Sequence, residues 1–508
     1  MPALAAPLRR LLLALTITAL TVEASLAASP AAQELPDIGT PADAVLTGSD
    51  EYKIGAMIIQ GLQDQGQILD DPEINEYINS VGARLASHAQ EGTIKFTFFV
   101  VKDRGINAFA LPGGFVCVNA GLLLATASES ELAGVLAHEI SHVTQRHIAR
   151  SIQNQSKASL ASAAAMLAAI LVGAVSGNAN VGMAGVMAGQ SAALQHQLNF
   201  SRENEYEADR VGIGVMAAAG YDPNAMGSFF ETLERRMGHP GPNAKILEFL
   251  QTHPVTSGRV AEAKSRATQY PIVRPVDTTG YRLARERIRV MTLGPEDNPR
   301  DVYADAAAAD FAVADYRYYG RALGLMQANA PNEAVPILRD LVNRHPDTIE
   351  YHSALGQALL GAGDIEGSRT VLARAKELFP RNVPVTVRYA ETLMRAGDAR
   401  LAHAVLLDLF NNVPPTQAQV RQIALAASAA GEAAEANYYM AEYHVMSGDL
   451  TLAIETLRLA LATPNLTLVQ RSRYKARIDE LKEYLPPRVQ AAVDRGEPLP
   501  TQPPDGRR

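Results

Sequence analysis

The chain has 508 residues, a hydrophobic content of 47% and a formal net charge of −8 at pH 7. This length allows two or three domains with a sizeable core. The acidic balance provides no basic surface for nucleic acid, so we expect no nucleic-acid partner. Cys117 is the single cysteine, which excludes an internal disulfide and predicts a buried thiol.

The first residues have the pattern of a secretory signal peptide. Arg9 and Arg10 precede an uncharged apolar run from Leu11 to Thr21, and small residues follow at 24–28. This pattern predicts export with cleavage after Ala27. A retained anchor is the alternative, but about 11 apolar residues are too short to span a bilayer. We expect a signal peptide at 1–27 and a tether at 28–49.

A second apolar stretch lies at 158–176 and carries no charge. Because it consists mostly of Ala and Ser, we favour a buried or partner-covered helix over membrane insertion. The glycine-rich continuation to Gly189 predicts a flexible or lid-like segment. Any membrane contact is therefore expected to be peripheral at most.

Two segments interrupt the helical periodicity of residues 50–270. Ile94–Val101 and Phe115–Val118 are rich in β-branched and aromatic residues and predict strands, with a turn at Pro112–Gly114 before the second. The polar stretch 271–308 contains scattered proline and glycine and is expected to be a connector. The Pro-rich, charged tail at 486–508 is expected to be disordered.

Between residues 309 and 485 the chain repeats with the period of a tetratricopeptide repeat. Pro346, Pro380 and Pro414 are 34 residues apart, and glycine–acid pairs at 363, 397 and 431 predict turns at the same interval. Small residues where helices would cross are Ala334, Ser368 and Ala402, and the following apolar positions are Leu338, Leu372 and Leu406. The units must stack to bury their faces, which predicts an α-solenoid with a curved surface for a protein partner. A plain helical bundle is the alternative and would lack that groove.

The segment His138-Glu139-x-x-His142 places two histidines four residues apart. Ser128 followed by Glu131 indicates a capping box, so a helix starts before them. Residues four apart share one helical face, so His138 and His142 can bind one zinc ion together. Glu139 would project beside the metal and could accept a proton from water. A closed structural zinc site is disfavoured, because this glutamate would then have no purpose.

A catalytic zinc needs a third protein ligand and an open position. The metzincin pattern is excluded, because Gln145 and Ile148 stand where that class has glycine and histidine. His147 would lie about 140° around a continuous helix from His142, so we interpret it as a surface or packing residue rather than a ligand. A later acidic run offers further candidates, and spacing does not choose among them: Glu203, Glu205, Glu207 and Asp209.

The two segments together resemble the paired signature of the M48 peptidases, the family of the prenyl-protein CAAX protease and the heat-shock membrane protease. The residues that carry the resemblance are His138-Glu139-x-x-His142 and Glu205-Tyr206-Glu207-Ala208-Asp209. The resemblance covers residues 50–270 and implies a mainly α, zincin-type metallopeptidase domain with a small β-sheet. It also implies that Glu205 is the third ligand of one Zn²⁺ per chain and that Asp209 orients a ligand histidine.

Export followed by a tetratricopeptide tail is similar to periplasmic members of this family. The resemblance implies a periplasmic endopeptidase that cleaves misfolded or stalled envelope proteins and gives chaperone-like help to outer-membrane protein assembly. Implied partners are unfolded or misassembled envelope proteins and the outer-membrane β-barrel assembly machinery. The alternative is a chaperone or assembly scaffold whose repeats hold clients and whose peptidase site is latent.

Two further expectations concern the cleft. Residues 107–114 are similar to the family's approach to an edge strand, and we expect substrate to lie extended along Phe115–Val118, paired backbone to backbone. By itself, His253 would be an ordinary histidine that caps a turn. The resemblance implies that a histidine after the ligand helix lies close to the metal, so our hypothesis is that His253 is a regulatory fourth ligand.

Overall fold

The computed structural model describes residues 47–89, 94–153, 202–237, 252–271, 278–303, 311–485 and 487–499. The predicted signal peptide, most of the predicted tether and the apolar stretch 158–176 lie outside these residues. The elements before the repeats are α2 (Gly48–Asp64), α3 (Pro72–Ala86), β1 (Thr97–Val101), β2 (Ala108–Leu111), β3 (Phe115–Asn119), α4 (Ala120–Ala125), α5 (Glu129–Thr144), α6 (His147–Gln153), α9 (Arg202–Ala218), α10 (Asn224–Met237) and α12 (Ser257–Ala267).

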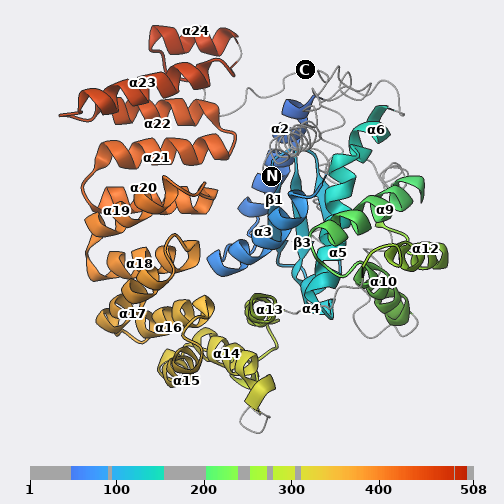
Figure 1. Cartoon of the computed structure of the whole chain (residues 1–508). Helices are drawn as coiled ribbons and strands as arrows, with labels where there is room; N and C mark the ends of the chain where they lie inside the picture. The colour runs from blue at the N-terminus through green and yellow to red at the C-terminus, as the bar shows by residue number, and fades with distance from the viewer. Residues whose placement is uncertain are drawn as a thin grey trace, which may run out of the picture. The chain divides into compact units, whose positions relative to one another are not determined.

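A three-stranded sheet in the order β1-β3-β2 lies beside α3 and α5 (Figure 1). β3 is parallel to β1, with Thr97 opposite Phe115, and antiparallel to β2, with Ala108 opposite Val118. Every residue of β3 is buried, including Cys117, as predicted for the single thiol. The predicted turn before β3 is present, with both of its glycines at positive φ.

The central helix of this part is α5, in which every residue from Glu129 to Thr144 is buried. It contacts α3, α9, α10 and strands β2 and β3. A helix that is buried all round belongs to the interior of a domain rather than to its surface. The histidine pair predicted from the sequence is therefore placed in the core.

The second half of the chain is a stack of paired helices, as the 34-residue period predicts (Figure 1). The helices are α14 (Phe311–Gln327), α15 (Pro331–Arg344), α16 (Ile349–Gly361), α17 (Ile365–Leu378), α18 (Val383–Ala396), α19 (Ala399–Phe410), α20 (Gln417–Ala429), α21 (Ala433–Met446), α22 (Leu450–Ala462) and α23 (Leu468–Lys482). The small residues predicted at the crossings are fully buried. At Gly356 an added Cβ would lie 2.4 Å from the Leu372 side chain, so the close packing of α16 and α17 would have to shift to accept a larger residue.

The expectation of a connector at 271–308 is wrong for its central part, which forms α13 (Thr279–Met291), followed by the short η3 (Pro299–Asp301). Two faces of α13 enter two different cores. Tyr281 and Ile288 pack in the core around the sheet, while Leu283 and Val290 pack with the first repeat helices. The prolines that suggested a connector flank the helix instead of interrupting it.

The expectation of a disordered tail at 486–508 is wrong for Pro487–Arg495, which forms α24. Val489, Ala492 and Val493 pack against the last hydrophobic cluster of the repeats, in which Leu499 is also buried. Arg458 donates hydrogen bonds to the backbone carbonyls of Val493 and Glu497. Helical apolar spacing within a charged segment is enough to dock this short helix.

A buried group of charges joins the start of α3 to α13 and to the repeat helix α18. Asp71 caps α3 and accepts hydrogen bonds from Arg287, with Nε to Oδ1 at 2.7 Å. Glu73 forms ion pairs with Arg287 at 3.1 Å and with Arg388 of α18 at 2.8 Å. Burial raises the pKa of Glu73, but the two arginine charges outweigh it, so the pKa lies far below its usual range.

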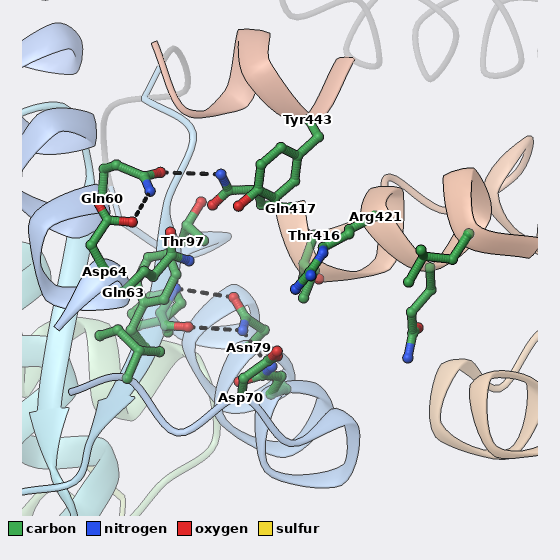
Figure 2. A pocket seen from close by; sticks show the side chains of 17 residues that line it. Gln60, Gln63, Asp64, Asp70, Asn79, Thr97, Thr416, Gln417, Arg421 and Tyr443 are labelled. Carbon is green, nitrogen blue, oxygen red and sulfur yellow. Dashed lines mark hydrogen bonds between the residues drawn. The ribbon is translucent and has the colours of Figure 1, made fainter. Parts of the chain in front are cut away.

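A cavity of about 400 Å³ lies between α2 and β1 on one side and α20 and α21 on the other (Figure 2). Gln417 donates a hydrogen bond to Gln60 across it at 3.1 Å. The carboxamide of Asn79 bonds both the N–H and the C=O of Phe98, so it covers part of the outer edge of β1. The repeats thus contact the metallopeptidase-like part through polar side chains here as well.

We predict that Glu73→Gln lowers the free energy of unfolding at pH 7 by about 3–5 kcal/mol, because it leaves buried arginine charge without its partner. The pKa of Glu73 is lower in the folded than in the unfolded chain, so its contribution is complete above about pH 4.5 and is lost as the pH falls further. Urea denaturation should therefore show a smaller difference between variant and wild type at pH 3 than at pH 7. Glu377→Gln, at an exposed position of the repeat helix α17, is the control. An equal difference at both pH values would contradict this assignment.

Candidate metal centre

Helix α5 begins where the sequence predicts and aims its two histidines at one point. Ser128 accepts a hydrogen bond from the N–H of Glu131, as the predicted capping box requires, and the Glu131 carboxylate accepts one from the N–H of Ala127. One turn separates His138 from His142, and their Nε2 atoms lie 3.0 Å apart. The start of the helix thus fixes the histidine pair in the core.

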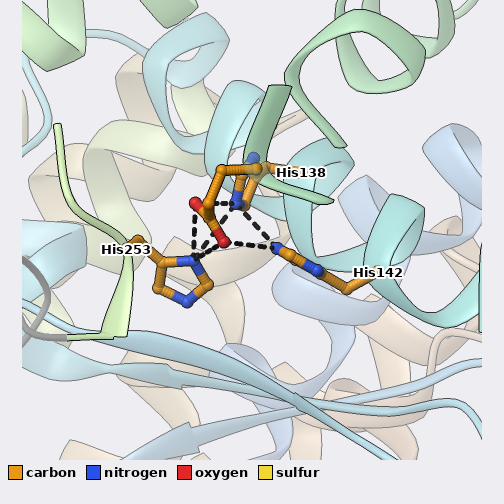
Figure 3. A group of neighbouring side chains, drawn as sticks. His138, His142 and His253 are labelled. Atoms are coloured by element: carbon orange, nitrogen blue, oxygen red, sulfur yellow. Dashed lines mark hydrogen bonds and ion pairs between the residues drawn. The ribbon is translucent and has the colours of Figure 1, made fainter. Parts of the chain in front are cut away.

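Two later segments bring further ligand atoms to the same point. Glu205 of α9 places Oε2 3.5 Å from Nε2 of His138 and Oε1 3.4 Å from Nε2 of His142. His253, just before α12, places Nδ1 3.1 Å from the Glu205 carboxylate and 3.3 Å from His138. Figure 3 shows the three labelled rings pointing toward one another.

The donor set fits a zinc ion. One atom from each of His138, His142, Glu205 and His253 lies within 4.8 Å of the other three, and all four side chains are buried. Zn²⁺ in proteins usually has four ligands in a tetrahedral arrangement, and imidazole nitrogen and carboxylate oxygen are among the atoms that bind it. With His253 withdrawn, three protein ligands and one open position would remain, which is the arrangement of a catalytic site.

Glu139 lies next to these atoms without a hydrogen bond. Both of its carboxylate oxygens are buried and have no hydrogen-bond partner among the described residues, and Nε2 of His253 is 3.6 Å from Oε1. An unsatisfied buried carboxylate is costly, and such groups are retained where chemistry needs them. This geometry leaves the Glu139 carboxylate free to accept a proton, as a general base must.

Asp209 contacts the ring nitrogen of His138 that does not face the other ligand atoms. Its Oδ1 lies 2.9 Å from Nδ1 of His138, one helical turn beyond Glu205. Arg259 of α12 fixes this carboxylate in turn, with Nε 2.7 Å from Oδ2, and it also contacts Glu205 at 2.8 Å. Arg259 donates as well to the carbonyl of Pro254, next to His253. One buried guanidinium therefore connects three parts of the cluster.

The charges of the cluster change its pKa values in opposite directions. Burial lowers the pKa of His138, but its hydrogen bonds to the carboxylates of Asp209 and Glu205 outweigh burial and raise the pKa to about 10. Burial lowers the pKa of His142 well below its ordinary value, with the charge of His138 adding to the effect. Burial raises the pKa of Glu205, but the His253 charge and the histidine hydrogen bonds hold it well below its usual range.

The surface alternative for His147 is wrong, whereas its absence from the group of four ligand side chains agrees with the prediction that it is not a ligand. The α5 helix ends at Thr144, and Arg146 adopts a left-handed φ of 51°, so the assumed continuous helix does not exist. His147 is fully buried, and its Nδ1 lies 2.8 Å from Nδ1 of His142. The left-handed residue between α5 and α6 places this side chain against a histidine of the cluster.

The expectation that substrate pairs with Phe115–Val118 is also wrong, because this segment is the central strand β3 and both its edges are occupied. β2 is an edge strand and contacts α5. The N–H of Asn119 donates to the carbonyl of Asn107, so antiparallel alternation turns the backbone groups of Ala108 and Ala110 away from β3. Among the described residues, these outward backbone groups have no hydrogen-bond partner.

Comparison with known proteins gives the class. The model of peptidase family M48 matches residues 72–267. A Vibrio cholerae protein is 34% identical over 457 residues, which cover 88% of this chain and 92% of the relative. The chain therefore belongs to peptidase family M48, a family of zinc-dependent metallopeptidases.

Along most of its length the chain is similar to one group of these peptidases. The beta-barrel assembly-enhancing protease of Escherichia coli strain K12 is 32% identical over 484 residues, covering 94% of this chain and 97% of that protein. The mitochondrial metalloendopeptidase OMA1 of Schizosaccharomyces pombe is 33% identical over 184 residues, covering 36% of this chain and 50% of that protein. Within the described residues, no helix is long and apolar enough to cross a membrane.

We predict that Asp209→Asn weakens zinc binding about 10- to 100-fold, because the carboxylate that orients His138 loses its charge. Competition with a chromophoric chelator measures this affinity on the purified chain. Glu203→Gln, an exposed change on the same helix, is the control and should bind zinc like wild type. Unchanged affinity of Asp209→Asn would remove Asp209 from the orienting role.

Proposed function

We propose that this chain is a zinc endopeptidase in which His138, His142 and Glu205 hold the metal and Glu139 is the general base. The observation that carries the proposal is the meeting of four buried ligand atoms next to a buried carboxylate that has no hydrogen-bond partner among the described residues. A bound zinc ion would supply Lewis-acid chemistry, making water acidic near pH 7 and polarising the scissile carbonyl. Glu139 would accept the proton of water and pass it to the leaving amine.

Substrate would bind as an added strand on the free edge of β2. The outward backbone groups of Ala108 and Ala110 offer hydrogen bonds to an extended chain and do not depend on its side chains. Such pairing accepts unfolded segments, because a folded strand cannot expose its edge in the same way. This supports misfolded or stalled proteins as the substrate class.

The cellular setting of the proposal rests on the relatives and on the N-terminal pattern. The similar proteins named beta-barrel assembly-enhancing protease support a role in outer-membrane protein assembly. The predicted signal peptide supports the periplasm as the compartment. We propose that the repeats hold envelope proteins or the β-barrel assembly machinery while the metal centre cleaves chains that have stalled.

His253 is proposed to keep this activity low until substrate or a partner removes it. Its imidazole lies among the ligand atoms and contacts Glu139, so it would occupy the position that water needs. The same contact favours a second candidate function, a repeat-based chaperone or scaffold whose peptidase site is latent. The two functions separate on whether a variant without turnover still supports outer-membrane protein assembly in cells.

We predict that Glu139→Gln retains one zinc ion per chain and loses turnover by about 10²- to 10⁴-fold, because the base is removed while the ligands remain. Cleavage of β-casein and metal analysis of the same sample measure both quantities. Glu203→Gln is again the control. Turnover near the wild-type level would show that another group accepts the proton.

We predict that His253→Ala raises the rate of β-casein cleavage several-fold, because the position it occupies becomes free for water. His88→Ala, at an exposed histidine of the described chain, controls for the loss of an imidazole elsewhere. Zinc content should stay at one per chain in both variants. A rate that is unchanged or lower would make inhibition by His253 untenable.

A further inference from the structure

The turn after α5 brings a second buried histidine onto the metal cluster. α5 ends at Thr144, and α6 starts at His147 after the left-handed residue Arg146. The rings of His142 and His147 meet edge to face with centroids 4.9 Å apart. His147 is 0% exposed, although an imidazole costs free energy to bury unless its nitrogens are hydrogen-bonded.

The nitrogen atoms of this pair define one arrangement of protons. Nε2 of His142 faces the cluster, 3.4 Å from Glu205, so it must carry the lone pair when it binds a metal. The neutral ring then has its hydrogen on Nδ1, which lies 2.8 Å from Nδ1 of His147. His147 must accept this bond and therefore carries its own hydrogen on Nε2.

That second hydrogen also has an acceptor in place. Nε2 of His147 lies 3.2 Å from Oε2 of Glu207, which is held by Arg150 of α6 at 3.1 Å. Two hydrogen bonds thus run in one direction, from His142 to His147 and from His147 to Glu207. The reverse direction would place a hydrogen on the ligand nitrogen and is incompatible with metal binding.

The two ligand histidines are therefore supported in parallel ways. His138 is held directly by Asp209, and His142 is held by His147, which is held in turn by Glu207. Both carboxylates come from α9, the helix that also carries Glu205. A packing role alone would need only an apolar side chain at 147, whereas the observed nitrogens match the donor and acceptor needs of a ligand ring.

We propose that His147 and Glu207 are positioning residues that fix the ring orientation and tautomer of His142 for metal binding. This inference rests on the proposed metal site. It assigns a function to two residues outside the four ligand side chains. Mutation of partners of this kind typically lowers metal affinity or activity about 10- to 100-fold.

The test compares two substitutions of the same histidine in the full-length mature chain. His147→Leu keeps apolar bulk and removes the acceptor, so zinc affinity measured by chelator competition should fall about 10- to 100-fold. His147→Asn places an oxygen close to the position of Nδ1, so it should restore most of the affinity. The visible spectrum of the Co²⁺-loaded chain should change in His147→Leu and remain close to wild type in His147→Asn.

Glu207→Gln tests the outer step at a partly exposed position, where folding is not at risk. It should weaken zinc binding less than His147→Leu does, and Glu203→Gln should leave it unchanged. Equal losses in His147→Leu and His147→Asn, or wild-type affinity in His147→Leu, would overturn the proposal. If the wild-type chain itself bound no zinc, the proposed function would fail instead, so the two failures are distinguishable.

Discussion

The burial of three imidazole rings and one carboxylate at a single point is the constraint on which the rest of this structure depends. Ionisable groups in a protein interior are costly unless opposite charge, hydrogen bonds or a metal ion compensates them. Here the compensation is layered: Arg259 holds Asp209 and Glu205, and these carboxylates hold the histidines. A divalent cation suits the centre of this group, because it would attract the carboxylate and take up the imidazole lone pairs.

Helix α9 organises this compensation. Glu205 and Asp209 contact the histidines of α5, and Glu207 contacts His147 at the start of α6. The site therefore depends on the contact between α5 and α9 rather than on the histidine motif alone. His253 comes from a third segment, and Arg259 links that segment to α9. A movement of the segment that carries His253 would therefore shift the ligand side chains.

The junction with the repeats uses the same principle at a second place. Asp71 and Glu73 at the start of α3 meet arginines from α13 and α18, and α13 supplies apolar residues to both neighbouring cores. Buried ion pairs constrain geometry more than they add stability, because desolvation offsets much of the attraction. The repeats are thus joined to the start of α3 by a specific buried contact.

The sequence alone determined what depends on local spacing: the start of α5, a histidine pair on one helical face, the turn before β3, and repeats with a period of 34, whose crossing residues are buried. It offered several acids for the cluster and chose among them only by family resemblance. Tertiary structure decided the rest. The residues around Arg146 do not predict its left-handed conformation. The strand order, with β3 in the centre and β2 at the edge, follows from the tertiary structure. Arg259 contacts the cluster only because α12 packs against α9. These outcomes depend on contacts between residues far apart in the chain, and local periodicity carries no information about them.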